Sequence, residues 1–354
     1  MGTILNALLL FVPLALAFKL LGVNPVLVFL ASAAGIVPLA GWMGRATEQV
    51  SHHVGPGMGS LLNASLGNAA ELIIALAALR GGLHEVVKAS LTGSIIGNSL
   101  LVLGLSMVWG GLRYERQRFN QTAASMGASL LLLAAIGLVV PALFHYTATD
   151  RAPDAERELS LEIAVVLFAI YLLSLVFSLR THRHLFAGRG EGTAEASEPS
   201  WTRSRAIGVL VVVTAAVVVI SEVLVSVLEP AAERLGMTQV FVGVILVALV
   251  GNAAEHSTAV LLARKNHMDL AYGIAVGSSL QIALFVAPLL VFTSYLVGRA
   301  PLDLIFSPFE VTAVAMSVVA VGFVAMDGES NWMEGVMLVG VYLILAIAFY
   351  VVPG

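Results

Sequence analysis

The sequence predicts an all-α membrane protein with about 11 transmembrane helices. Of its 354 residues, 59% are hydrophobic and 11% are charged, whereas a soluble domain is typically about 45–50% apolar and about 25% charged. Charged and Gly/Pro-rich segments divide the apolar sequence into runs of roughly 20–28 residues, long enough for a helix to cross a bilayer. The pentapeptide Gly-Asn-Ala-Ala-Glu occurs twice, at 67–71 and 251–255, which indicates a duplicated fold.

The apolar runs give the predicted helices in chain order. Residues 1–24 hold a leading transmembrane helix, which we expect to be retained because no basic segment precedes it. A polar stretch near the midpoint, 183–203, is predicted to be a linker; it carries Arg183, Arg189, Glu191, Glu195 and Glu198. The predicted spans are 3–22, 25–52, 57–80, 84–110, 119–146, 158–180, 204–230, 238–264, 269–297, 308–326 and 332–352.

The duplication extends beyond the pentapeptide. Its two copies lie 184 residues apart, and the same offset relates Gly59 to Gly243, Gly93 to Gly277 and Ser94 to Ser278. We therefore predict two five-helix repeats, 25–182 and 204–354. Because five is odd, the second repeat crosses the membrane in the opposite sense, which is the inverted-repeat design of many secondary transporters. Convergent use of small residues at helix contacts is the alternative explanation.

The distribution of Lys and Arg predicts the orientation, because cytoplasmic loops carry an excess of both. The side with the N-terminus and linker holds 11 of them: Arg45, Arg113, Arg116, Arg118, Arg180, Arg183, Arg189, Arg203, Arg205, Arg264 and Lys265. The other side holds seven: Lys19, Arg80, Lys88, Arg151, Arg157, Arg234 and Arg299. The N-terminus and the linker should therefore be cytoplasmic.

The two pentapeptides place polar groups in apolar surroundings. Asn68 and Glu71 are three residues apart, as are Asn252 and Glu255, so each pair shares one helix face. An intramembrane Glu is costly and indicates a functional site. Inverted topology would bring both carboxylates near the bilayer centre, where they need protons or a cation. The alternative is a buried Glu held neutral by hydrogen bonds.

The span after each motif adds further oxygen atoms. Ser94 and Ser278 each follow their Glu by 23 residues, Asn98 continues the first span, and Gln281 continues the second. Several hard oxygen ligands favour Ca²⁺ or a similar divalent ion. Backbone carbonyls released near Gly67, Gly93, Gly251 and Gly277 are further candidate ligands. A buried Ser often bonds only to its own helix, which is the alternative for both serines.

Other polar residues are weaker candidates. Glu48, Glu222 and Glu229 are candidates for guiding cations to the site, and a helix-end or interfacial role is the alternative for each. The same alternatives apply to Glu310. His256 follows Glu255 and points about 100° further round the helix; it is a candidate for proton access or a packed helix-contact residue.

Several classes of function are excluded or disfavoured. The chain contains no Cys, which excludes disulfides and thiolate metal sites. It has no Walker-type loop, no nucleophile elbow and no His-Glu-x-x-His motif, so we expect neither an enzyme nor a resident cofactor. No basic patch predicts nucleic-acid binding.

These motifs carry a family resemblance. The segments 67–75 (GNAAELIIA) and 251–256 (GNAAEH) resemble the repeat motifs of the Ca²⁺/H⁺ antiporters, the cation/proton exchanger branch of the calcium:cation antiporter superfamily. Further similar segments are 38–48, 93–98, 277–283 and 327–335, and the resemblance covers nearly the whole chain from about Pro25. The acidic segment between the halves is shorter than in the family, so a regulatory role for it is not expected.

The resemblance implies one leading helix and two inverted five-helix repeats. It implies that Glu71 and Glu255 bind Ca²⁺ and H⁺ in competition. The site lining that it implies is Asn68, Asn252, Ser94, Ser278, Asn98 and Gln281. It also implies that Glu48, with Glu229 or Glu222, assists access.

We therefore expect an antiporter that exchanges cytoplasmic Ca²⁺ for H⁺. We expect it in the plasma (inner) membrane of a prokaryote. The alternatives are an exchanger of another cation pair, with Na⁺ or Mn²⁺, and a passive cation channel.

Overall fold

The structure is a computed structural model that describes residues 6–54, 56–147, 153–182, 185, 200–297 and 300–351. Most of the predicted linker 183–203 lies outside these residues, including its charged positions Arg183, Arg189, Glu191, Glu195 and Glu198. Arg151 and Arg299 of the charge argument also lie outside them.

The described chain is almost entirely helical. The first half contains η1 (Leu8–Leu10), α2 (Phe11–Leu20), α3 (Pro25–Val54), α4 (Pro56–Leu66), α5 (Ala69–Gly81), α6 (His84–Ile96), η2 (Gly97–Val102), α7 (Leu103–Gly111), β1 (Gln117–Arg118), α8 (Gln121–Thr147), α9 (Pro153–Val176) and η3 (Phe177–Thr181). The second half contains α11 (Arg203–Ser226), α12 (Leu228–Leu235), α13 (Gln239–Phe241), η4 (Val242–Val247), α14 (Ala248–Arg264), α15 (Met268–Gln281), η5 (Ile282–Val286), α16 (Ala287–Val297), α17 (Pro308–Val324), β2 (Glu329–Ser330) and α18 (Trp332–Val351).

Length and composition support the membrane assignment. Among the described residues, eight helices are long and apolar enough to cross a membrane, and two shorter apolar helices span Leu8–Leu20 and Pro308–Val324. The predicted span 57–80 is divided into α4 and α5. This is an all-α membrane protein, as predicted, while the number of 11 transmembrane helices stays a prediction.

The chain forms two compact units that cut across the predicted repeats. Unit 1 comprises Met1–Ser90, Ala194–Ala254 and Val352–Gly354, and unit 2 comprises Leu91–Thr193 and Glu255–Val351. Each unit therefore takes segments from both halves of the sequence. The division falls between Ala254 and Glu255, so the second pentapeptide contributes to both units.

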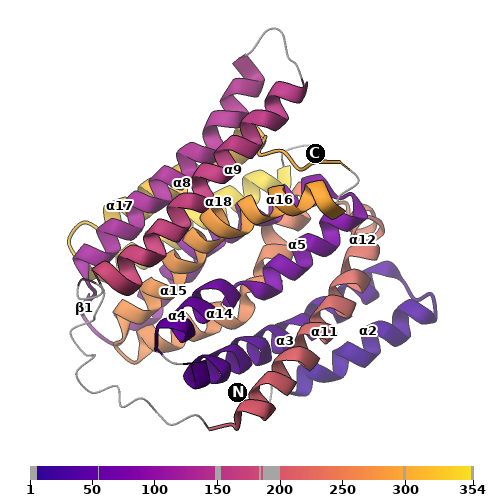
Figure 1. Ribbon diagram of the computed structural model, residues 1–354, viewed down its shortest axis with the longest axis horizontal. Coiled ribbons are helices and arrows are strands. Elements are labelled where there is room, and N and C mark those ends of the chain that lie inside the picture. The colour runs from indigo at the N-terminus through magenta and orange to yellow at the C-terminus, as the bar shows by residue number, and fades with distance from the viewer. Residues whose placement is uncertain are drawn as a thin grey trace. The chain divides into compact units, whose positions relative to one another are not determined.

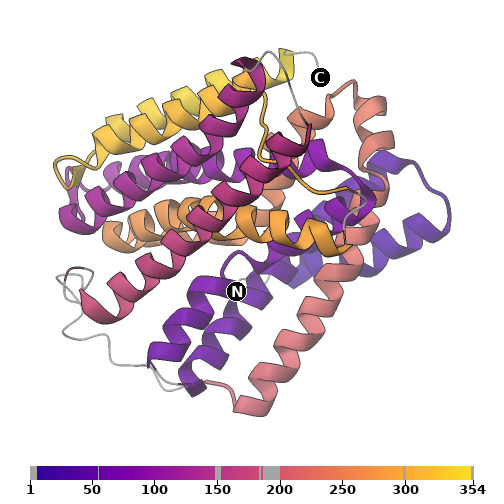
Figure 2. The same ribbon diagram turned by 45° about the horizontal axis from the view of Figure 1, so that its top comes forward.

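Unit 1 is built around the long helix α3. Helices α2 and α11 pack against α3 (Figures 1 and 2), and α11 also contacts α5. At the start of α11, the buried Trp201 stacks on Trp42 with ring centroids 5.9 Å apart. Gln49 of α3 accepts a hydrogen bond from the Trp201 backbone N–H at 3.1 Å. These contacts fix the beginning of α11 on α3.

Unit 2 packs α18 against α7, α17 against α8, and α16 against α9. In Figure 1 α8 and α17 run side by side. The two short strands β1 and β2 pair antiparallel, and Arg116 and Arg118 both form ion pairs with Glu329 there. Backbone pairing and ion pairs therefore join the two inter-helix loops at this end of unit 2.

Two predicted spans differ from the observed helices. The span 57–80 is interrupted because Asn68 leaves the helical region (φ −94°, ψ 28°) and α5 begins at Ala69. Gly67 and Asn68 both have weak helix propensity, and α5 ends at Gly82, whose left-handed φ of +82° suits glycine. The span 204–230 ends at Ser226, so Glu229 lies on the separate helix α12.

Four π-helical segments occur among the described residues: η2, η3, η4 and η5. Two of them, η2 and η5, follow the serine-bearing helices α6 and α15 and lie at nearly corresponding places in the two halves. A π turn often marks a functional site because its wider spacing redirects side chains. The feature places Asn98 at the start of a π turn and Gln281 just before one.

Candidate functional site

The first motif sits at the break between α4 and α5. Asn68 is 2% exposed and is the residue before α5, and Glu71 lies half-buried in the first turn of that helix. The backbone carbonyl of Asn68 accepts from the Leu72 N–H at 3.1 Å. A carboxylate in the first turn is stabilised by the helix dipole. The break therefore fixes Asn68 and Glu71 beside a helix N-terminus.

Unit 1 also brings the first glycine of the second motif against this glutamate. Gly251 is buried on α14, and a Cβ atom at this position would lie 3.0 Å from Cγ of Glu71 and 3.8 Å from Cδ1 of Ile74. Only glycine leaves room for the Glu71 side chain at its present position. Glu71 of the first pentapeptide and Gly251 of the second thus approach each other within unit 1.

The amide of the second motif is also buried in unit 1. Asn252 is 1% exposed, and its Nδ2 donates to the Ala248 carbonyl at 2.9 Å, one turn earlier on α14. Because the amide nitrogen only donates, Asn252 would coordinate a cation through its oxygen. The helix is continuous through Gly251, in contrast to the first motif.

The glutamate of the second motif belongs to unit 2. Glu255 accepts a hydrogen bond from the Ser278 hydroxyl of α15. Ser278 is among the residues that the sequence predicts to line the site, and its role as a cation ligand stays a prediction. Ser278 is buried, so the hydroxyl donates to a carboxylate in a water-poor environment, where hydrogen bonds are strong.

His256, the residue after Glu255, contacts another candidate site residue of unit 2. Its Nε2 lies 3.0 Å from Oδ1 of Asn98, and Asn98 is 1% exposed. Because the asparagine oxygen only accepts, the histidine nitrogen is the donor. This contact agrees with a packed helix-contact role for His256. It also places His256 beside Asn98, which is a candidate site residue.

Ser99 of η2 and Ser279 of α15 form a side-chain contact between the segment that carries Asn98 and the helix that carries Ser278. Ser99 and Ser279 are both fully buried, and their hydroxyl oxygens are 3.0 Å apart. Ser279 also donates to the Ile95 carbonyl of α6 at 3.3 Å. The predicted residues did not include Ser99, and only its position beside Asn98 pointed to it. The two serines fix α15 against α6 and η2.

The remaining predicted residues are placed as follows. Ser94 is buried on α6, and Gln281 is half-buried at the end of α15. Helices α6, α14 and α15 continue past Gly93, Gly251 and Gly277. The chain therefore stays helical at these three glycines, and the release of carbonyls near them stays a prediction. At Gly67 the chain does leave the helix.

The access candidates lie at exposed helix ends. Glu48 is exposed near the end of α3. Glu222 is near the end of α11 and forms an ion pair with Arg80 at 3.3 Å, with both side chains more than half exposed. Glu229 accepts a hydrogen bond from Gln239 at 2.8 Å. These placements agree with the helix-end alternative for all three.

Comparisons with known proteins identify the family. The model of the sodium/calcium exchanger protein family matches residues 24–180 and 205–351. A protein of Synechocystis sp. named Ca(2+)/H(+) antiporter is 47% identical over 365 residues, which cover 98% of this chain and 96% of that protein. This chain belongs to the Ca²⁺/H⁺ antiporters of the sodium/calcium exchanger family.

Other antiporters and solved structures agree. The Ca(2+)/H(+) antiporter ChaA of Bacillus subtilis is 43% identical, with 96% of both chains covered. The crystal structure of the Ca²⁺/H⁺ antiporter protein YfkE is 39% identical and superposes with a TM-score of 0.85, covering 99% of this chain and all of that one. The H⁺/Ca²⁺ exchanger CAX has the same fold, with a TM-score of 0.74 at 15% identity. This antiporter is therefore a transporter and not an enzyme, as predicted.

Proposed function

We propose that this protein exchanges cytoplasmic Ca²⁺ for H⁺ across the membrane. The observation that carries the proposal is the nearly full-length similarity, at 47% and 43% identity, to two bacterial proteins named Ca(2+)/H(+) antiporter. Ca²⁺ and H⁺ are then transported substrates and not resident cofactors. The bacterial relatives support a plasma-membrane location. The excess of Lys and Arg on one side supports a cytoplasmic N-terminus and central linker.

In this proposal Glu71 and Glu255 bind either Ca²⁺ or protons. A carboxylate in a low-dielectric interior is costly unless a proton or a cation neutralises it, so the two ligands compete for the same oxygen atoms. Two equivalent positions in inverted repeats support one shared site. The close approach of Glu71 to Gly251 supports it further, because a Cβ atom added at Gly251 would lie 3.0 Å from Cγ of the first repeat's glutamate.

The other oxygen ligands come from the same two motifs and from the helices that follow them. We assign Asn68, Asn252, Ser94, Ser278, Asn98 and Gln281 to the lining of the site. Their amide and hydroxyl oxygens are hard ligands that suit Ca²⁺, which takes six to eight oxygen atoms. The Ser278 contact supports this assignment, since it aims a hydroxyl at the Glu255 carboxylate.

Access to the site would alternate by movement of α3 and α11 against the motif helices. The two helices pack extensively on each other, and Trp201 fixes the start of α11 to α3, so we expect them to move as a pair. Glu48, Glu222 and Glu229 would attract cations at the exposed ends of these elements. The domain boundaries proposed from sequence, 25–182 and 204–354, nearly coincide with the two matched segments.

The test is Ca²⁺ uptake into proteoliposomes that contain the purified protein. An imposed pH gradient should drive ⁴⁵Ca²⁺ uptake, and a proton ionophore should abolish it. Protein-free liposomes are the control for leakage. Uptake that ignores the pH gradient would contradict the proposal.

Exchange of Ca²⁺ for Na⁺ is the alternative that a specific observation favours. The matching family is described as sodium/calcium exchanger protein, so Na⁺ is the counter-ion to exclude. Replacing the pH gradient by a Na⁺ gradient in the same liposomes separates the two. Competition by Mn²⁺ measures selectivity, and Ca²⁺ flux without any coupled gradient would indicate a channel.

A further inference from the structure

Unit 2 buries a carboxylate for which the exchange mechanism has no use. Glu310 is 2% exposed and lies in the first turn of α17. Its Oε2 accepts from the Ser307 backbone N–H at 3.0 Å and from the Ser307 hydroxyl at 2.8 Å, which completes a capping box. Its Oε1 accepts from the Thr92 hydroxyl of α6 at 3.2 Å. Glu310 thus links α17 to the helix that carries Ser94.

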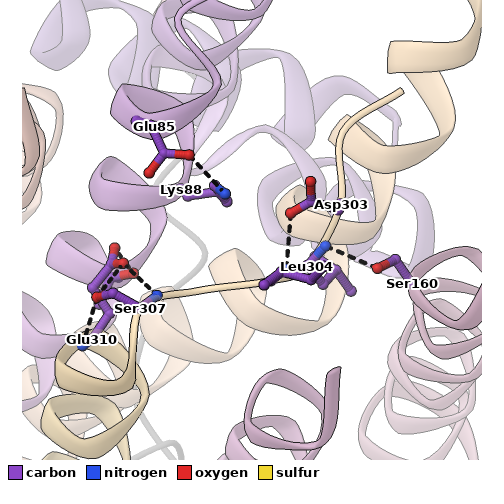
Figure 3. Close-up of polar contacts among 9 residues, drawn as sticks. Glu85, Lys88, Ser160, Asp303, Leu304, Ser307 and Glu310 are labelled. Atoms are coloured by element: carbon purple, nitrogen blue, oxygen red, sulfur yellow. Dashed lines mark hydrogen bonds and ion pairs between the residues drawn. The ribbon is translucent and has the colours of Figure 1, made fainter. Parts of the chain in front are cut away.

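The segment before α17 holds Glu310 in place. Between residues 300 and 307 the chain is extended, and Leu302, Leu304 and Phe306 are buried. The Leu302 N–H donates to the Ser294 hydroxyl at 2.8 Å, and the Leu304 N–H donates to the Ser160 hydroxyl at 3.1 Å. Figure 3 shows Leu304 facing Ser160 and, further along the same segment, Ser307 beside Glu310. The cap of α17 is therefore anchored to α9 and α16.

Hydrogen bonds hold helix α6 at two levels along its axis. Thr92 donates to Glu310 of α17. One turn later, the Ser279 hydroxyl of α15 lies 3.3 Å from the Ile95 carbonyl and 3.1 Å from the Ala275 carbonyl of its own helix, so the two carbonyls share one donor. Thr92 and Ser94 are two residues apart, which places them about 200° apart around the helix axis. Glu310 therefore holds α6 from the face nearly opposite Ser94. Hydrogen bonds at two levels of one helix resist its rotation, whereas a single hydrogen bond would let the helix turn about that point.

The second repeat lacks this polar tie. At the offset of 184 residues, Thr92 corresponds to Val276 and Glu310 corresponds to Met126. Val276 of α15 packs beside Gly127 of α8. A Cβ atom added at Gly127 would lie 3.1 Å from Cγ1 of Val276. The equivalent helix contact is thus apolar in one half and contains a carboxyl group in the other. Repeat symmetry does not account for a buried carboxylate here.

We propose that Glu310 is a positioning residue that sets the rotation of α6 through Thr92 and so orients Ser94 and Asn98 toward the transported cation. This rests on the exchange function proposed above. A side-chain oxygen about 4.5 Å from a helix axis moves by about 0.8 Å when the helix turns by about 10°. Metal–ligand distances hold within about 0.2 Å, so a small rotation removes a ligand.

The test measures the half-saturating Ca²⁺ concentration and the maximal rate of pH-driven uptake in proteoliposomes. Thr92→Val removes the hydroxyl and gives α6 the residue that the second repeat has at this place. Glu310→Gln removes the charge, and Thr92→Ser restores the hydroxyl. Thr312→Val is the matched control, because Thr312 is on the same helix and donates only to the Pro308 carbonyl of α17 at 2.6 Å.

We expect Thr92→Val and Glu310→Gln each to raise half-saturating Ca²⁺ by about three- to tenfold with a smaller change in maximal rate. The double variant should be no worse than the stronger single variant, and Thr92→Ser and Thr312→Val should resemble wild type. If Glu310→Gln does not fold, Thr92→Val and Thr92→Ser decide alone. Wild-type half-saturation in Thr92→Val, or equal loss in Thr92→Ser, would overturn the positioning role. Absence of exchange in the wild type would instead overturn the proposed function.

Discussion

Glu71 of the first motif lies against Gly251 of the second, and a Cβ atom at position 251 would be 3.0 Å from Cγ of that glutamate. Both residues belong to unit 1, although the second pentapeptide is divided between the two units after Ala254. Their close approach explains why the second copy begins with glycine on a helix that is otherwise continuous, where glycine costs stability. A side chain at position 251 would crowd Glu71.

Gly251→Ala should therefore displace Glu71 and weaken Ca²⁺ binding. Overpacking a close contact costs about 1–3 kcal/mol, so we expect half-saturating Ca²⁺ to rise by about fivefold or more. Uptake kinetics in proteoliposomes measure this change. Gly208→Ala on α11 is the control, because a Cβ there meets no atom within 4 Å. Equal kinetics of the two variants would show that the approach of Glu71 to Gly251 has no role.

Ser278→Ala should lower Ca²⁺ affinity through Glu255. The Ser278 hydroxyl donates to that carboxylate, and a hydrogen bond to a charged group is worth about 1.5–3 kcal/mol. We expect about a tenfold or larger increase in half-saturating Ca²⁺. Thr293→Ala is the control, since among the described residues the Thr293 hydroxyl donates within α16, to the Leu289 and Leu290 carbonyls. A larger effect in the control than at Ser278 would contradict the assignment.

Asn98 and His256 should behave as one unit. Their side chains meet at 3.0 Å in unit 2, and contacting residues usually show interaction energies of about 0.5–3 kcal/mol. Asn98→Ala and His256→Ala should each destabilise the purified protein, and the double variant should lose less than the sum. Thermal unfolding in detergent measures the three variants. Simple additivity would mean that the contact contributes nothing.

Trp201 should be a main determinant of stability in unit 1. It is 8% exposed, stacks on Trp42, and has the Arg205 guanidinium 5.1 Å from its ring centroid. Truncation of a buried Trp costs about 3–5 kcal/mol, so Trp201→Ala should lower the unfolding temperature markedly. Trp109→Ala is the matched control, because Trp109 is 48% exposed. An unfolding temperature equal to that of Trp109→Ala would refute the anchoring role of Trp201.

The sequence predicted the helical membrane fold because apolar runs of this length have few other solutions. It also singled out Ser278 from a spacing that recurs in both halves, although it did not predict the hydrogen bond to Glu255. It did not predict the break at Asn68, since the identical pentapeptide is continuous in α14. Identical residues adopt different backbones there, and the surrounding structure decides between them.

The role of Glu310 shows another limit. The pattern Ser307-x-x-Glu310 indicates a capping box, which agrees with the expected helix-end role. The bond to Thr92 joins residues 218 positions apart, and one sequence holds no signal for such a pair. Glu48, Glu222 and Glu229 illustrate the same limit, because intramembrane and surface glutamates look alike in sequence.

The most direct test of the account compares wild type with Glu71→Gln and Glu255→Gln in one experiment. Each glutamine keeps the size of the side chain and removes the group that binds Ca²⁺ or a proton. The three proteins, reconstituted at equal density, are measured for ⁴⁵Ca²⁺ uptake driven by a pH gradient. We predict that uptake is abolished in both variants, and near-normal uptake in either one would contradict the exchange mechanism.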